Sequence, residues 1–212
     1  MSRYSENMEE LSNSMAAFNK TIEVFWDADA AVSSVKRNSA KTQENVNKFN
    51  SAYKSYTMLL QQGYTCVYWQ LFNMFSNCDG FKNREQAWNY LISGVNAKEC
   101  ACLGELAIMY IFGNEYFGVS KDINQAKQIL KNAYFIDKKN SDTVKWHRDN
   151  YREGIVKCYM AMRIIYENYG GLGESEKEQK KNLKRCLKII KECKKWYEVK
   201  KWVKTIESRM NI

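Results

Sequence analysis

The chain contains no proline among its 212 residues. Proline normally occupies turns and the edges of strands, so its absence argues against proline-rich linkers and a string of small domains. It suits long helices joined by short turns, and eight of the ten glycines lie between segments with helical apolar spacing. With 45% apolar and 14% aromatic residues, the sequence is also too hydrophobic for an unfolded chain.

Apolar runs long enough to cross a bilayer are also missing, and the first ten residues lack the apolar core of a signal peptide. These features predict a cytoplasmic protein with no membrane partner. The seven cysteines are an odd number and most fall on apolar helix faces, so we expect buried, reduced thiols. Cys100 and Cys102 form a Cys-x-Cys pair, but no second cysteine pair and no nearby histidine completes a zinc site. The prediction is no metal and no cofactor.

Residue types for catalysis are scarce. His147 is the single histidine, and its neighbours in sequence supply no argument for a serine or cysteine nucleophile beside it. The sequence has no glycine-rich phosphate loop, no His-Glu-x-x-His motif and no calcium-binding loop. We therefore predict that the protein is not an enzyme, and we assign it no catalytic residues.

Apolar spacing predicts an all-α fold. The first part of the chain gives a long helix, roughly 5–36, followed by a second helix that ends at Gly63. Large apolar residues recur along the first helix at heptad-like spacing, so residues 1–63 are interpreted as an N-terminal helical hairpin or coiled coil. A hairpin within one chain and a homodimer through the N-terminal helix both fit this spacing.

Residues 64–212 are predicted to form a second domain made of shorter helices with basic helices at its C-terminal end. The expected helices are 65–77, 83–94, 98–113, 122–136, 142–169, 175–195 and 198–210. Three of them begin with a capping box, in which a small acceptor side chain precedes Gln or Glu by three residues. The capping residues are Asn83, Asp122 and Ser175.

Within this domain the sequence repeats itself. Leu106–Tyr110 is related to Leu71–Phe75, thirty-five positions earlier, and a weaker third copy begins at Met162. Small residues at positions 104, 107, 126 and 133 let the two helices of a hairpin approach each other. Stacked hairpins then bury the faces that a single hairpin leaves exposed.

The strongest copy resembles the Sel-one-like repeat, a relative of the tetratricopeptide repeat. The match is good over residues 98–137 and fair over 66–97. The residues that match the family pattern are Leu106, Met109, Tyr110, Gly113, Gly118, Val119, Asp122, Ala126 and Ala133. Ala107 stands where the family usually has glycine, and Asn114–Phe117 lengthens the loop between the two helices. The resemblance implies a short right-handed solenoid of helical hairpins that scaffolds protein–protein contacts and has no catalytic activity.

In repeats of this family the first helices line the concave side, so the resemblance also implies where a protein partner binds. The partner-binding candidates are Glu105, Met109 and Phe112, then Gln70 and Met74 one repeat earlier, and Tyr116 and Phe117 in the longer loop. Methionine and aromatic side chains are types that anchor partners. We expect Met109 to face away from the core and the loop to need neither aromatic residue for folding. The alternative is that Met109 and Phe112 fill the gap to a neighbouring hairpin.

The formal net charge of +9 is concentrated at the C-terminal end, where residues 175–212 hold thirteen Lys or Arg against five Glu. Lysines recur there at helical spacing, opposite an apolar face of Leu183, Leu187, Ile190 and Cys193. The candidate polyanion-binding residues are Lys177, Lys180, Lys181, Lys184, Lys188, Lys191 and Lys195. A solvated helix face and a non-specific nucleic-acid contact both fit them. A nucleic-acid-binding protein, or a component or inhibitor of a nucleoprotein complex, is therefore the alternative function.

Overall fold

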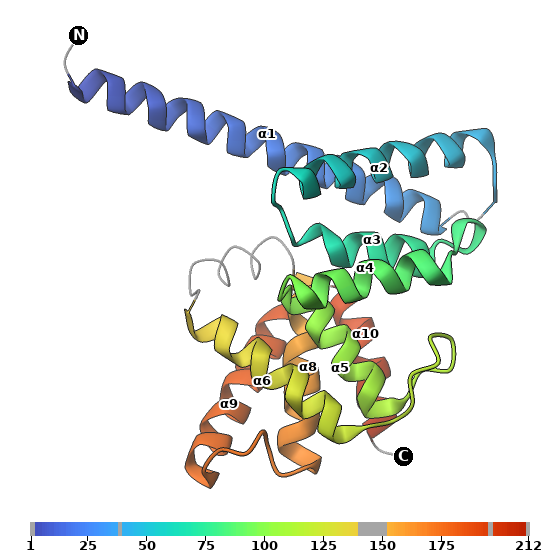
Figure 1. Cartoon of the computed structure of the whole chain (residues 1–212), viewed down its shortest axis with the longest axis vertical. Helices are drawn as coiled ribbons and strands as arrows, with labels where there is room; N and C mark the ends of the chain where they lie inside the picture. Colours follow the sequence, from blue (N-terminus) through green and yellow to red (C-terminus); the bar gives the residue numbers. More distant parts are fainter. Residues whose placement is uncertain (1–2, 38–39, 140–151, 195–196, 211–212) are drawn as a thin grey trace. The chain divides into compact units, whose positions relative to one another are not determined.

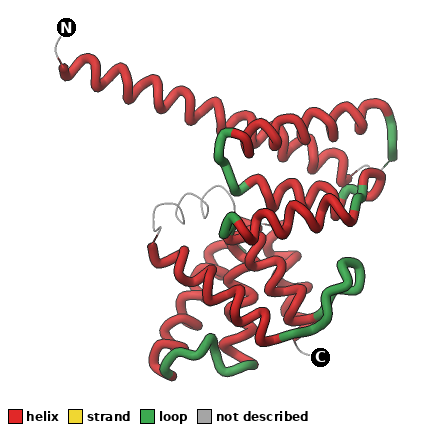
Figure 2. Tube along the Cα trace, viewed as in Figure 1, coloured by secondary structure: helices red, strands yellow, loops and turns green. Residues whose placement is uncertain are grey.

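The computed structural model describes residues 3–37, 40–139, 152–194 and 197–210, and over these residues the chain is all-α (Figures 1 and 2). It divides into two compact units, Met1–Ala87 and Trp88–Ile212. The predicted boundary between residues 63 and 64 lies inside the first unit, where α3 packs against both α1 and α2. The helix α4, Arg84–Asn96, contains the division between the two units.

The first unit is built on α1, Arg3–Arg37, which packs along α2, Gln43–Gln61, within the same chain. The helix α3, Val67–Asn77, and a short 3-10 helix, Asp79–Phe81, complete the unit. Phe49 of α2 stacks on Phe81 with ring centroids 4.4 Å apart and meets the edge of Phe75. The side chains of residues 3–18, which begin the heptad-like spacing, lie outside the described residues, so the homodimer stays a prediction.

In the described part of the second unit five further helices follow, of which α5, Cys100–Phe112, and α6, Ile123–Lys139, pack together as a pair. After them come α8, Arg152–Asn168, α9, Glu176–Cys193, and α10, Tyr197–Met210. Each of these helices overlaps one predicted helix. Residues 142–151 of the predicted long helix, including His147, lie outside the described residues.

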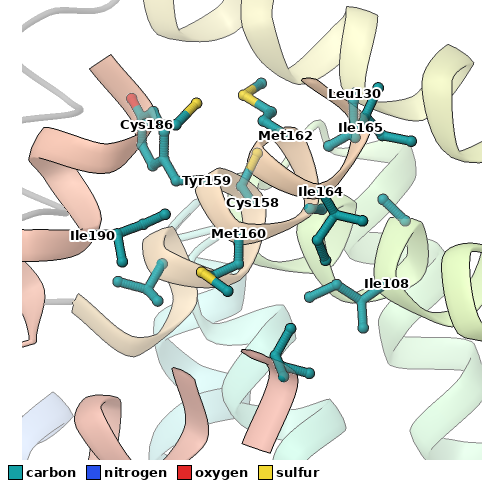
Figure 3. Close-up of a cluster of buried hydrophobic side chains, with 14 of the residues drawn as sticks. Ile108, Leu130, Cys158, Tyr159, Met160, Met162, Ile164, Ile165, Cys186 and Ile190 are labelled. Atoms are coloured by element: carbon teal, nitrogen blue, oxygen red, sulfur yellow. The ribbon is translucent and has the colours of Figure 1, made fainter. Parts of the chain in front are cut away.

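The helix α8 is the centre of the second unit and packs against α5, α6, α9 and α10. From Val156 to Tyr166 its side chains are buried on all sides, apart from the half-buried Arg163. Figure 3 shows Cys186 and Ile190 of α9 on one side of it and Leu130 of α6 with Ile108 of α5 on the other. A helix whose side chains are buried around nearly its whole circumference is enclosed by other helices, and here most of those side chains are apolar.

Close approach of α5 to α8 depends on Gly104. A Cβ atom at this position would overlap the backbone nitrogen of Cys158 and lie 2.6 Å from its Cα. The sequence predicted that small residues bring together the two helices of one hairpin. At Gly104 the close neighbour is instead α8, which belongs to the following pair of helices.

The predicted capping residues are confirmed, since each of the three side chains accepts a hydrogen bond from a backbone N–H of the first helical turn. The side-chain oxygen of Asn83 accepts from Gln86 at 3.0 Å, and Ser175 Oγ accepts from Glu178 at 3.4 Å. Asp122 Oδ1 accepts from both Asn124 and Gln125, at 2.9 and 3.0 Å. These bonds satisfy donors that have no partner within the helix.

We expect Asp122→Ala to lower the free energy of unfolding by about 1 kcal/mol, because it leaves two backbone donors at the start of α6 without their acceptor. Asp122→Asn is the matched control, since the amide oxygen still accepts from the same N–H groups and the loss should be much smaller. Urea unfolding followed by circular dichroism measures both. Equal losses in the two variants would contradict the capping role.

Candidate partner-binding surfaces

The three candidates on α5 do not form an open surface. Met109 is only 3% exposed, so the prediction that it faces away from the core is wrong. Glu105 pairs with the Lys157 ammonium of α8, and the Arg209 guanidinium of α10 lies 4.2 Å from the centre of the Phe112 ring. The rest of the second unit therefore engages Glu105 and Phe112 before any partner arrives.

Gln70 and Met74 on α3 are also buried. Both lie on the apolar helix that closes the first unit, where every residue from Leu71 to Phe75 is buried as well. The repeat alignment placed these two residues at positions equivalent to Glu105 and Met109. The structure gives Gln70 and Met74 interior positions, so neither is available to a partner.

The loop between α5 and α6 presents the other two candidates on a fixed backbone. Asn114 and Val119 exchange backbone hydrogen bonds of 2.7 and 2.9 Å, and the Asn114 side chain accepts from the N–H of Phe117 at 3.0 Å. Asp122 N–H donates to the Tyr110 carbonyl at 2.8 Å and anchors the end of the loop. Few backbone groups at the tip are therefore left to move independently.

Tyr116 and Phe117 differ in their surroundings. The Phe117 ring stacks on Trp88, with centroids 5.7 Å apart and planes 30° apart, and is half-buried. Phe117 therefore has a packing contact within the unit, while the expectation that folding needs neither residue stays a prediction. Tyr116 meets the edge of Phe117 at 4.8 Å but is 45% exposed. Of the seven partner-binding candidates it is the one that offers a large side chain to solvent.

The lysines of α9 face outward as predicted. Lys177, Lys180, Lys181, Lys184, Lys188 and Lys191 are all exposed, and Lys195 lies outside the described residues. The opposite face buries Asn182, Cys186, Ile189, Ile190 and Cys193 in the core of the second unit. Leu187 does not belong to that face, contrary to the prediction. It is 40% exposed and lies among the lysines.

An ion-pair network fastens the C-terminal helices to one another. Glu207 of α10 accepts from Arg163 of α8 at 2.7 Å and from Lys194 at 2.9 Å. Burial opposes ionisation of this carboxyl, but the bonds from Lys194 and Arg163 hold the pKa of Glu207 below its usual value. These contacts fix α10 against α8 and against Lys194 at the C-terminal end of α9.

The N-terminus of α5 contains a buried carboxyl that the sequence did not reveal. Glu99 is 4% exposed, and its Oε2 accepts from the backbone N–H of Cys102 at 2.7 Å. Burial raises the pKa of Glu99 to about 7, against the opposing effect of hydrogen bonds from Cys102 and Ala101. Burial, followed by the neighbouring Glu99, raises the pKa of the Cys102 thiol well above its usual value. A thiol that holds its proton this firmly is a poor nucleophile and a poor metal ligand.

Within the described part of the chain, no group of three or more His, Cys, Asp or Glu side chains is placed to hold a metal ion. The helices described there include none that is long and apolar enough to cross a membrane. Comparison with protein-family models, with curated proteins and with solved structures gives no match. The assignment of a function therefore depends on the surfaces themselves.

Proposed function

We propose that this chain is a non-catalytic interaction scaffold built on Sel-one-like repeats, and that it binds another protein. The observation that carries the proposal is Tyr116, a large aromatic side chain that is 45% exposed at the tip of a hydrogen-bonded loop. Tyrosine anchors protein interfaces because it buries a large ring and keeps a polar end for hydrogen bonding. Since the loop backbone is already ordered, little conformational entropy is lost on binding.

The arrangement of helices in the second unit supports the same proposal. In stacked helical hairpins, each hairpin packs against the next one along the chain. Here α5 packs against its partner α6 and against α8, which in turn packs against α9 and α10. Solenoids of this kind typically present surfaces for protein partners rather than catalytic pockets.

We expect Tyr116→Ser to weaken partner binding by roughly 2 kcal/mol or more while leaving the melting temperature nearly unchanged. The reason is that Tyr116 is exposed and contributes little to the core, whereas it offers a partner a large aromatic side chain on the loop. The full-length protein is used to capture partners from extracts of the source cell, with and without nuclease. Quantitative mass spectrometry then compares the wild type with the variant.

Two controls make the result specific. Met58→Ser removes a side chain of similar exposure from α2 and should leave capture unchanged. Phe117→Ser should lower the melting temperature, because the Phe117 ring stacks on Trp88. If Tyr116→Ser captures protein partners at wild-type levels, the loop is not the binding site. Partners that disappear with nuclease would favour the nucleic-acid alternative.

A further inference from the structure

The outward face of α9 is strongly basic. Along Glu176–Cys193 the helix carries six lysines and Arg185 against three glutamates. The buried residues of α9 all lie on the other side of the helix, so the exposed side is a single continuous basic face. One of its cations, Lys180, pairs with Glu176 at 2.6 Å in a fully solvated ion pair, which contributes little.

Leu187 lies halfway along this face, at its border with the buried side of the helix, because its neighbours three and four residues away include Leu183 and Ile190 as well as Lys184 and Lys191. Lys180, Lys184, Leu187 and Lys191 follow one another at intervals of three or four residues, which places them in one row along the helix. At a rise of about 1.5 Å per residue the row is about 16 Å long. An isolated exposed leucine needs no explanation, but here it is the apolar centre of a row whose other members are cations.

We propose that this face of α9 is a docking site for an acidic amphipathic helix of a partner protein, with Leu187 as its apolar anchor. Glutamates spaced at three and four residues on such a helix would match the lysine row in both charge and period. An apolar side chain on the partner helix would cover Leu187 and exclude water from that edge of the contact, where the lysine row meets the buried side of α9. The core contacts of Cys186, Ile189 and Ile190 hold the face rigid before binding.

The same observations disfavour nucleic acid as the occupant. Single-stranded nucleic acid binds on aromatic platforms, and α9 has no aromatic residue along its length. Base edges are read mainly by arginine, asparagine and glutamine, whereas six of the seven cations are lysines. A phosphate backbone also offers nothing that would cover Leu187.

This site goes beyond the proposed function because it is a second surface. Figure 1 shows α9 and the loop between α5 and α6 at opposite sides of the second unit. A protein bound at Tyr116 therefore leaves α9 accessible, and a scaffold with two such surfaces can hold two partners at once. Loss of one surface leaves the other intact, so the two proposals fail separately.

The test uses the full chain and two fluorescent probes. One is an amphipathic peptide of about 20 residues with a leucine stripe flanked by glutamates, and the other is an oligothymidylate of about 20 nucleotides. Anisotropy titrations at about 50 and 200 mM salt give the dissociation constants. The variants are Leu187→Ser, the double variant Lys184→Glu/Lys188→Glu, and the control Lys200→Glu/Lys204→Glu on the exposed face of α10. The two double variants change the net charge equally.

We expect the α9 double variant to weaken peptide binding at least about tenfold, and the α10 control by less than about threefold. Leu187→Ser should weaken the peptide by about fivefold or more and leave the oligonucleotide unaffected. Circular dichroism spectra should show that every variant keeps its helix content. Tighter, steeply salt-dependent oligonucleotide binding that ignores Leu187→Ser would overturn the proposal in favour of nucleic acid. Absence of peptide binding, or equal losses in the two double variants, would show that α9 is not a docking face.

Discussion

Gly104→Ala is expected to destabilise the protein by about 3 kcal/mol or more. In an exposed helix the same change normally stabilises by about 1 kcal/mol, so the expected sign is reversed. A Cβ atom at Gly104 would lie 2.6 Å from Cα of Cys158, whereas carbon atoms in contact lie about 3.5–4.0 Å apart. The obstructing atoms belong to the backbone of α8 and cannot rotate away, so α5 and α8 would have to separate.

Gly63→Ala is the matched control for this substitution. Gly63 has a positive φ of 90° but open space around its Cβ position, so alanine there costs only backbone strain, about 1–2 kcal/mol. Thermal and urea unfolding of the two variants separate strain from steric overlap. A Gly104→Ala protein that unfolds at or above the wild-type midpoint would mean that α5 and α8 are not packed as closely as described.

Glu99 is expected to give the protein a stability that falls as the pH rises. Its pKa is raised from 4.5 to about 7, so the folded state holds the proton more tightly than the unfolded state. The stabilisation is fully present below pH 4.5 and is lost as the pH rises through about 7. At about 1.36 kcal/mol per pKa unit, this effect amounts to ~3 kcal/mol.

The measurement compares Glu99→Gln with the wild type by urea unfolding at several values between about pH 5 and pH 8. Glutamine stays uncharged, so the variant's free energy of unfolding does not fall with pH in this way. Relative to the wild type, the free energy of unfolding of the variant should therefore rise by roughly 2 kcal/mol between pH 5 and pH 8. Glu44→Gln serves as the control. Glu44 is exposed, and its hydrogen bond with Lys48 lowers the pKa of its carboxyl instead of raising it. A Glu99→Gln difference that is independent of pH would refute the assignment.

Much of the fold was predictable because it is encoded locally. The order of the described helices follows from apolar spacing, and the starts at Asn83, Asp122 and Ser175 follow from capping chemistry within four residues. The orientation of each helix was less predictable. Leu187 was expected to be buried and is exposed, whereas Met109 was expected to be exposed and is buried. The reason is that the apolar residues of α5 and α9 cover a wide arc of each helix. The helices that pack against them, which are distant in sequence, decide which part of the arc is buried.

The buried polar groups were the hardest to find. Glutamate is an uncommon residue at the N-cap, so Glu99 had no recognisable pattern beyond an acid before an apolar segment. Lys157 was also missed, because in sequence it is one lysine of many. Only the folded chain brings it against Glu105, with its ammonium 5.0 Å from the centre of the Trp202 ring.

The central position of α8 has a consequence for synthesis of the chain on the ribosome. Cys158, against which Gly104 packs, is made about fifty residues later. At roughly 5–20 residues per second, α5 and α6 wait several seconds for the helix that covers them. During that interval their apolar faces are open to chaperones and to other nascent chains. Slowing translation between these segments should therefore reduce the yield of soluble protein more than slowing it after α8 is complete.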